Sequence, residues 1–142
     1  MKKIVIFFVI IIIILVLLFS CYANYKSKYN QLQKENYEYE QYYQKELEGA
    51  NLATLINKAI DNNTKNNIEK DNKGKYIENE QNSIKIQIYM SDNDTTYDME
   101  TIYNGGIDKF VKNFNIIKFK CTKIEYHKNK KIKSLLFEQT QQ

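Results

Sequence analysis

The sequence predicts an α+β protein in which an N-terminal transmembrane helix continues into a helical stalk and leads to a small antiparallel sheet with helices on one face. Three observations predict this fold. An unbroken apolar run follows Lys2 and Lys3, apolar and aromatic residues then recur at spacings of three and four, and an alternation with a period of two appears in the second half of the chain. We therefore expect one small domain behind a membrane anchor.

The apolar run covers residues 4–19 and predicts a transmembrane helix. A helix of this length rises about 24 Å, short of a hydrocarbon core of about 30 Å, so the mild residues 20–23 complete the span. Residues 1–3 then form a short cytoplasmic segment. Their lysines favour a single-pass protein of the cell membrane with its C-terminal domain outside the cytoplasm, although Lys26 and Lys28 behind the span leave the inverted topology open.

Three fates are open for this N-terminal segment. It can remain as an uncleaved signal anchor, or it can be cleaved after Cys21-Tyr22-Ala23, which resembles a small-x-small cleavage site. The third fate is lipid attachment at Cys21, because Leu18-Phe19-Ser20-Cys21 resembles a bacterial lipobox. Each of these fates leaves the rest of the chain outside the cytoplasm.

Residues 24–48 predict a helical stalk, because no glycine or proline interrupts the helical spacing before Gly49. The stalk carries a heptad-like seam, formed by Tyr25, Tyr29, Leu32, Asn36, Tyr39 and Tyr43. This seam has two interpretations. It pairs with a partner helix in a coiled coil, with Asn36 fixing the register, or it packs onto the protein's own domain.

Residues 49–142 predict the extracytoplasmic α+β domain. Gly49 can end the stalk, and Asn51 can cap a second helix with a core-facing stripe of Leu52, Leu55, Ile56, Ala59 and Ile60. After this helix, residues 68–77 predict a short exposed hairpin that turns at residues 71–74.

A strand-strand-helix-strand-strand order is expected for the remainder. Alternating residues at 84–90 predict a first strand, and a second is expected near residues 96–103. Asn104-Gly105-Gly106 breaks the chain before a short amphipathic helix marked by Ile107, Phe110, Val111 and Phe114. Strands at residues 116–126 and 131–138 complete the sheet.

The residues expected of an enzyme or a cofactor site do not form recognisable motifs. His127 is expected in an exposed lysine-rich turn, and no nucleophile, zinc or phosphate-loop pattern occurs in the sequence. Cys21 at the membrane boundary and Cys121 inside a strand are not expected to pair, and Cys121 is expected to be a buried apolar residue. We therefore expect no catalytic, cofactor-binding or metal residues.

Oxygen-bearing side chains alternate at Asp92, Asp94, Thr96 and Asp98 in the way that a calcium loop begins. The pattern then fails, because Tyr97 stands at the sixth position, where such a loop needs glycine. We expect a solvated β-turn here and no metal ion.

The charge of the chain favours some partners over others. The formal net charge is +4, and lysines gather in residues 116–133. Nucleic acid is not expected as a partner outside the cytoplasm. Anionic envelope polymers or lipid headgroups suit such a surface better, although outward-facing lysines on a strand are also ordinary solvent-facing residues.

The predicted architecture resembles type IV pilin-like subunits, in which a membrane helix runs into an amphipathic half and then a small α+β head. Leu52-Ala53-Thr54-Leu55-Ile56-Asn57-Lys58 and the segment Phe119–His127 are similar to segments of uncharacterised single-span proteins of low-GC Gram-positive bacteria. Residues 1–48 resemble cell-division proteins with a span, a juxtamembrane coiled coil and a distal domain.

These resemblances imply a membrane-anchored, non-enzymatic structural or assembly protein whose stalk or head contacts other proteins of the cell envelope. The alternative is a lipid-anchored binding module, modified at Cys21, whose head holds a polymer or a small ligand. No small-molecule substrate is identified by the sequence.

Overall fold

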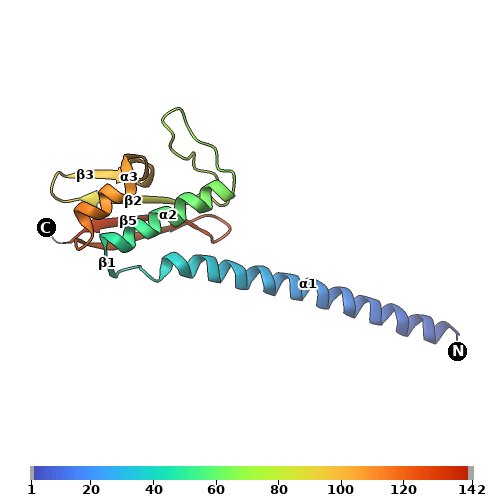
Figure 1. The fold of residues 1–142 in the computed structure, drawn as a ribbon. Coiled ribbons are helices and arrows are strands. Elements are labelled where there is room, and N and C mark those ends of the chain that lie inside the picture. Colours follow the sequence, from blue (N-terminus) through green and yellow to red (C-terminus); the bar gives the residue numbers. More distant parts are fainter. Residues whose placement is uncertain (1, 141–142) are drawn as a thin grey trace. The chain divides into compact units, whose positions relative to one another are not determined.

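The computed structural model describes residues 2–140. The chain divides into two compact units, Met1–Glu35 and Asn36–Gln142. Helix α1 spans Lys2–Glu40, so its last residues belong to the second unit (Figure 1). Every side chain from Ile4 to Phe19 is exposed, and α1 is the one helix among residues 2–140 that is long and apolar enough to cross a membrane.

The predicted stalk is shorter than expected, because α1 ends at Glu40 rather than near residue 48. Gln44 adopts a left-handed backbone conformation with φ of 58°, which a continuing helix cannot contain. Glu46–Glu48 then forms strand β1, whose backbone pairs with strand β4. Pairing with the sheet satisfies backbone groups that the last turns of a stalk helix would leave to water.

The sheet has five strands in the order β1-β4-β5-β2-β3. Their bounds, after β1, are Lys85–Met90 (β2), Thr95–Asp98 (β3), Lys118–Tyr126 (β4) and Ile132–Gln139 (β5). The α+β class and the four strands expected after residue 84 are confirmed. The antiparallel arrangement is wrong for one pair, because β2 and β5 run parallel and make the sheet mixed.

The parallel pair follows from the connection between two hairpins. Strands β2 and β3 form the first hairpin, and β4 and β5 form the second. Helix α3, Met99–Phe114, links them, and such a crossover can bring a strand back parallel to an earlier one. Strand β5 therefore lies between β4 and β2, where both of its edges are paired.

Helices α2, Gly49–Lys65, and α3 pack against the sheet and build the core of the second unit. Burial alternates along β2, so one face of the sheet meets the helices and the other faces solvent. The predicted stripe of α2 is confirmed, since all five of its residues are buried. The largest fully buried side chains include Phe119, Phe137, Leu52, Ile56, Ile86 and Ile88.

Gly49 begins α2 instead of ending the stalk, and Glu48 rather than Asn51 occupies the N-cap position. The reason is a close approach between two helix ends. A Cβ atom on Gly49 would lie 2.0 Å from the backbone oxygen of Phe114, at the end of α3. Only glycine lets these two backbones meet without displacement.

Helix α3 is longer than the sequence predicts. Residues 99–103, expected in a strand, form its first turns, and strand β3 ends at Asp98. The expected break appears as a kink at Gly106, whose φ of 102° and ψ of 107° lie outside helical values. The kink divides α3 into two arms.

A long connection between α2 and β2 carries the predicted hairpin, which protrudes from the second unit in Figure 1. Lys70 and Tyr76 form an isolated antiparallel bridge, and the amide of Gly74 donates to the carbonyl of Asp71 at 2.9 Å. The hairpin and its turn at residues 71–74 are confirmed.

Candidate functional site

The structure separates the residues of the predicted seam. The amide of Asn36 donates to the carbonyl of Lys130 at 2.7 Å and accepts from the amide of Ile132 at 3.1 Å. Tyr39 lies in the core, and burial raises the pKa of its hydroxyl. Asn36 and Tyr39 therefore agree with the second interpretation of the seam, in which it packs onto the protein's own domain. Tyr43 is exposed beside Cys121, with which it forms a backbone bridge.

The remainder of the seam lies in the first unit. The rings of Tyr25 and Tyr29 stack with centroids 6.5 Å apart, and both side chains are exposed. Leu32 is half-buried. The seam residues available to a partner helix are therefore Tyr25, Tyr29 and Leu32.

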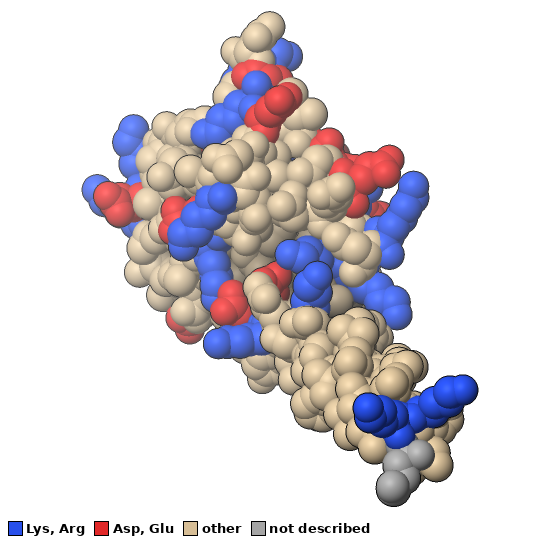
Figure 2. Space-filling view, turned by 90° about the vertical axis from the view of Figure 1, so that its right-hand side faces the viewer, with Lys and Arg blue, Asp and Glu red and all other residues tan. Residues whose placement is uncertain are grey.

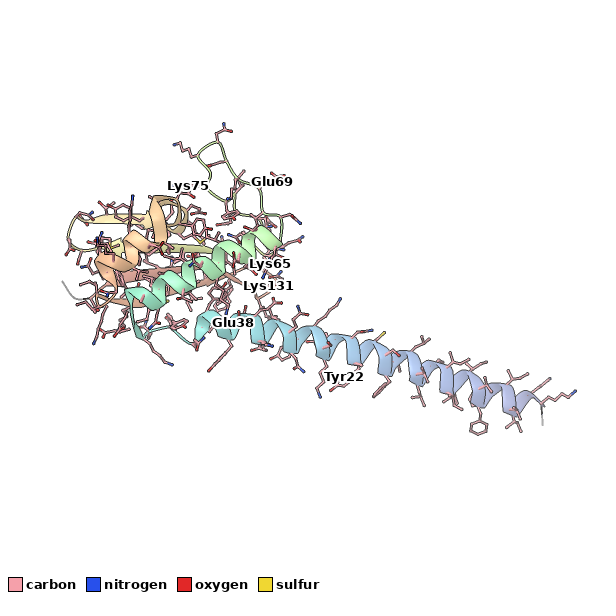
Figure 3. All side chains as sticks on the ribbon, viewed as in Figure 1. Tyr22, Glu38, Lys65, Glu69, Lys75 and Lys131 are labelled. Atoms are coloured by element: carbon pink, nitrogen blue, oxygen red, sulfur yellow. The ribbon has the colours of Figure 1, made fainter. Side chains whose placement is uncertain are left out.

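The end of α1 is also fixed within the second unit by charge and hydrogen bonding. Glu38, labelled in Figure 3, pairs with Lys58 of α2 at 2.7 Å. Glu40 accepts from the hydroxyl of Tyr126 at 2.9 Å. Burial, together with this carboxylate, raises the pKa of Tyr126 to about 12, so the hydroxyl stays protonated and continues to donate.

The two cysteines are free thiols in different surroundings. Cys21 is exposed on α1, where an acyl chain would meet no steric obstacle from its own unit. Cys121 is fully buried on β4, and burial raises the pKa of its thiol to about 11. Cys121 therefore behaves as the small apolar residue that the sequence predicts.

His127 contradicts the expectation of an exposed turn residue, because its side chain is only 6% exposed. Its Nε2 atom lies 2.7 Å from the carbonyl oxygen of Ser83, just before β2. The imidazole is buried because the β4–β5 turn meets the chain that enters β2. His127 is thus a structural link between two segments far apart in sequence.

The acidic residues at 92–98 have separate partners. Asp94 accepts from the hydroxyl of Tyr89 at 2.8 Å, and Asp92 accepts from the side-chain amide of Gln139 at 3.1 Å. Burial opposes ionisation of Asp98, but its contacts with Lys75 and Lys85 hold the pKa of this carboxyl below its ordinary value. Within residues 2–140, no three His, Cys, Asp or Glu side chains are grouped to hold a metal ion.

A pocket of about 280 Å³ lies between the β2–β3 turn and the kinked helix α3. Most of its lining is apolar, and these side chains belong to the core or pack against it. They are Met90, Tyr97, Ile102, Phe110 and Phe114. Gly105 and Gly106 form part of the wall, so that backbone rather than side chain borders the pocket at the kink.

Polar side chains surround this apolar floor. Asp92 and Asn93 come from the β2–β3 turn, and Thr101, Lys109 and Asn113 come from the two arms of α3. The amide of Asn93 donates to the hydroxyl of Tyr97 at 2.8 Å, which leaves the amide oxygen of Asn93 available. Within residues 2–140, the side chains of Thr101, Lys109 and Asn113 make no hydrogen bond or ion pair with other groups of the chain.

The sequence did not predict this pocket, although it predicted the β2–β3 turn and a change of backbone direction at the glycines; the glycines kink α3 instead of separating a strand from a helix. The pocket depends on the distance between α3 and the turn, which the core determines. The available signal was the pair Gly105-Gly106 inside an amphipathic pattern, since a glycine in a helix is tolerated at a cost and often has a packing or functional reason.

The net charge of the protein lies in the first unit. Of the 21 basic and 17 acidic residues, this unit contains Glu35 and the lysines at 2, 3, 26, 28 and 34, so the second unit carries as many acids as lysines. Figure 2 shows both signs interspersed over the visible face of the second unit. The second unit therefore has no overall attraction for a polyanion.

No family model matches this chain, and no curated protein or solved structure matches it either.

Proposed function

We propose that the chain is a membrane-anchored, non-enzymatic protein of the cell envelope, in which α1 is the anchor and the second unit is a binding or assembly module. The observation that carries this proposal is the continuous apolar surface from Ile4 to Phe19, in which every side chain is exposed. An apolar surface of this extent is unfavourable in water and typical of membrane contact. The second unit has its own core and needs no burial by α1's apolar run.

The proposed orientation places Lys2 and Lys3 in the cytoplasm and the second unit outside it. The proposed partners are other envelope proteins, as in a pilin-like or envelope-complex subunit. Tyr25, Tyr29 and Leu32 support contact through α1, because they are the seam residues of this helix that are not buried in the second unit. The cell-division resemblance has weaker support, since Asn36 and Tyr39 are used within the domain and the seam is short.

A lipid-anchored binding module is the second candidate, and the exposed thiol of Cys21 favours it. Acylation there would add an anchor that does not depend on the helix remaining uncleaved. Incorporation of palmitate that disappears in Cys21→Ser would distinguish this candidate from a simple signal anchor.

The orientation can be tested with the reporter Ile116→Cys, because Ile116 is 75% exposed. We expect a membrane-impermeant maleimide to label this variant in intact cells, and the protein to stay with membranes after alkaline carbonate washing. The reporter is placed in a Cys21→Ser background, and Cys21→Ser alone is the control, since Cys21 is an exposed thiol whereas Cys121 is fully buried and should react little. Labelling that appears only after lysis would contradict the extracytoplasmic orientation, and release by carbonate would contradict the anchor.

A further inference from the structure

We propose that the pocket between the β2–β3 turn and α3 binds one neutral N-acetylated amino-sugar unit of a surface glycan. The location of that ligand rests on the proposed function, but the chemistry of the pocket is an independent argument. A sugar of this kind combines an apolar acetamido methyl and C–H faces with several hydroxyl groups. The pocket has a complementary surface, with an apolar floor for the methyl group and C–H faces and polar side chains around it for the hydroxyl groups.

The floor suits the apolar parts of such a ligand. Phe110 and Met90 are buried beneath it, and the partly buried ring of Tyr97 forms another part of the lining. Aromatic rings bury large apolar area, and the hydroxyl of a tyrosine adds a polar contact at the edge. The acetamido methyl and one C–H face can lose water against these side chains.

The polar groups suit hydroxyl and amide groups. The carboxylate of Asp92 and the amide oxygen of Asn93 can accept hydrogen bonds, while the amide of Asn113 can both donate and accept. A purely apolar ligand would remove these groups from water without replacing their hydrogen bonds, which is unfavourable. The polar rim therefore favours a polyhydroxyl ligand over a lipid chain.

The charge and the volume of the pocket further restrict the class of ligand. Asp92 and Lys109 place one charge of each sign at the pocket, and the second unit as a whole is balanced. A polyanion gains no net attraction there. The volume of about 280 Å³ lies just below the usual range for small-molecule sites, about 300–1,000 Å³, and fits a single sugar ring better than a large cofactor.

The membrane anchor would keep the pocket near glycans at the cell surface. Residues 24–35 separate the predicted span from the second unit, and even a fully extended chain of this length reaches only about 40 Å. The second unit is therefore confined to a layer near the membrane, whatever its orientation within that layer.

The test uses the full chain in phosphatidylcholine nanodiscs, which avoids sugar-based detergents, with the N-acetylglucosamine trimer as the probe. We expect saturation-transfer NMR to show its strongest signal at the acetamido methyl. The glucosamine trimer carries ammonium groups in place of the acetamido groups, and maltotriose carries neutral hydroxyl groups there. Both should give signals at least about threefold weaker, and for the neutral maltotriose this corresponds to the loss of the methyl contact. Equal signals from all three sugars, or none, would overturn the proposal.

Matched variants locate the binding. A Cβ on Gly105 meets no atom within 4 Å, so Gly105→Leu starts a bulky side chain at the pocket wall with no clash at its Cβ, whereas Gly105→Ala adds little volume. We expect Gly105→Leu to abolish the signal and Gly105→Ala to retain it. Asn113→Ala should weaken binding about three- to tenfold, the value of one neutral hydrogen bond, while Asn104→Ala, outside the pocket, should not.

Binding unchanged in both Gly105→Leu and Asn113→Ala would place the sugar elsewhere and overturn the proposal. The maleimide experiment with Ile116→Cys is independent of this result. Sugar binding by a chain whose second unit faces the cytoplasm would retain the pocket chemistry and reject the proposed location. An extracytoplasmic second unit that does not bind the sugar would reject the pocket proposal alone.

Discussion

At the scale of single residues, three buried polar side chains connect segments of the second unit through backbone hydrogen bonds. Asn36 joins the end of α1 to the β4–β5 turn, and His127 joins that turn to Ser83. Asn63 of α2 is fully buried and uses both ends of its amide on the backbone of Ile84, donating at 2.7 Å and accepting at 2.8 Å. Each side chain supplies the hydrogen bonds that water would supply at the surface.

Asn63→Ala should therefore be strongly destabilising. It leaves the amide and carbonyl of Ile84 buried without their partners, which predicts a loss of about 2–4 kcal/mol in the free energy of unfolding. Chemical unfolding of the full chain in nanodiscs, followed by circular dichroism, measures this change.

The matched control for this substitution is Asn62→Ala on the same helix. Within residues 2–140 the Asn62 side chain has no hydrogen-bond partner, so its loss should change stability by about 0.5 kcal/mol or less. Alanine favours a helix more than asparagine does, so helix propensity predicts no loss in either variant. Similar losses in the two variants would contradict a specific role for the hydrogen bonds between Asn63 and Ile84.

At the scale of elements, glycines decide how the helices meet their surroundings. Gly49 allows the start of α2 to touch the end of α3, where a Cβ would lie 2.0 Å from a backbone oxygen. Gly105 stands before the kink of α3 with open space around its Cβ position. Close packing therefore requires glycine at position 49, whereas position 105 has room for a larger side chain.

This contrast predicts opposite effects for two identical substitutions. Gly49→Ala must displace backbone atoms of α2 or α3, and we expect it to lower the free energy of unfolding by about 2 kcal/mol or more. Gly105→Ala should raise it by up to about 1 kcal/mol, because alanine favours a helix more than glycine does. Thermal unfolding of the two variants beside the parent chain measures both. A stabilising Gly49→Ala would show that the helix ends can separate freely.

At the scale of the whole molecule, one helix that is long and apolar enough to cross a membrane is joined to a second unit with equal numbers of acidic and basic residues. The net positive charge of +4 lies in Met1–Glu35, on both sides of the apolar run, where it can interact with lipid headgroups. The second unit presents both signs of charge, and the pocket between the β2–β3 turn and α3 combines apolar and polar lining. The proposed membrane attachment and the proposed ligand recognition therefore belong to different parts of the chain.

This division predicts where a partner helix can be captured. Single cysteines replacing Tyr25, Tyr29 or Leu32 should crosslink to a neighbouring envelope protein, because these side chains lie outside the protein's own core. A cysteine at Tyr39 should not, since Tyr39 is 4% exposed. Crosslinking in membranes, with a Cys21→Ser background, measures the pattern. Capture at Tyr39 as strong as at Tyr29 would contradict the assignment of Tyr39 to the core.

The sequence alone predicted the features that depend on local pattern. The apolar run, the buried stripe of α2, the turn at residues 71–74 and the alternation of β2 are all present. Each follows from residues close together in the chain, whose spacing determines which side of a helix or strand is apolar. The α+β class follows from the order of those patterns.

The tertiary structure determined the features that arise from contacts between residues far apart in the chain. The end of α1, the burial of His127 and the parallel pairing of β2 with β5 all arise from contacts between distant segments. The pocket likewise needs the β2–β3 turn and both arms of α3 at fixed distances. The physical reason is that helical spacing shows which side of a helix is apolar, but not whether a partner helix or the protein's own domain covers that side. Only the competition for burial within the folded chain assigned Asn36 and Tyr39 to the core and left Tyr25 and Tyr29 exposed.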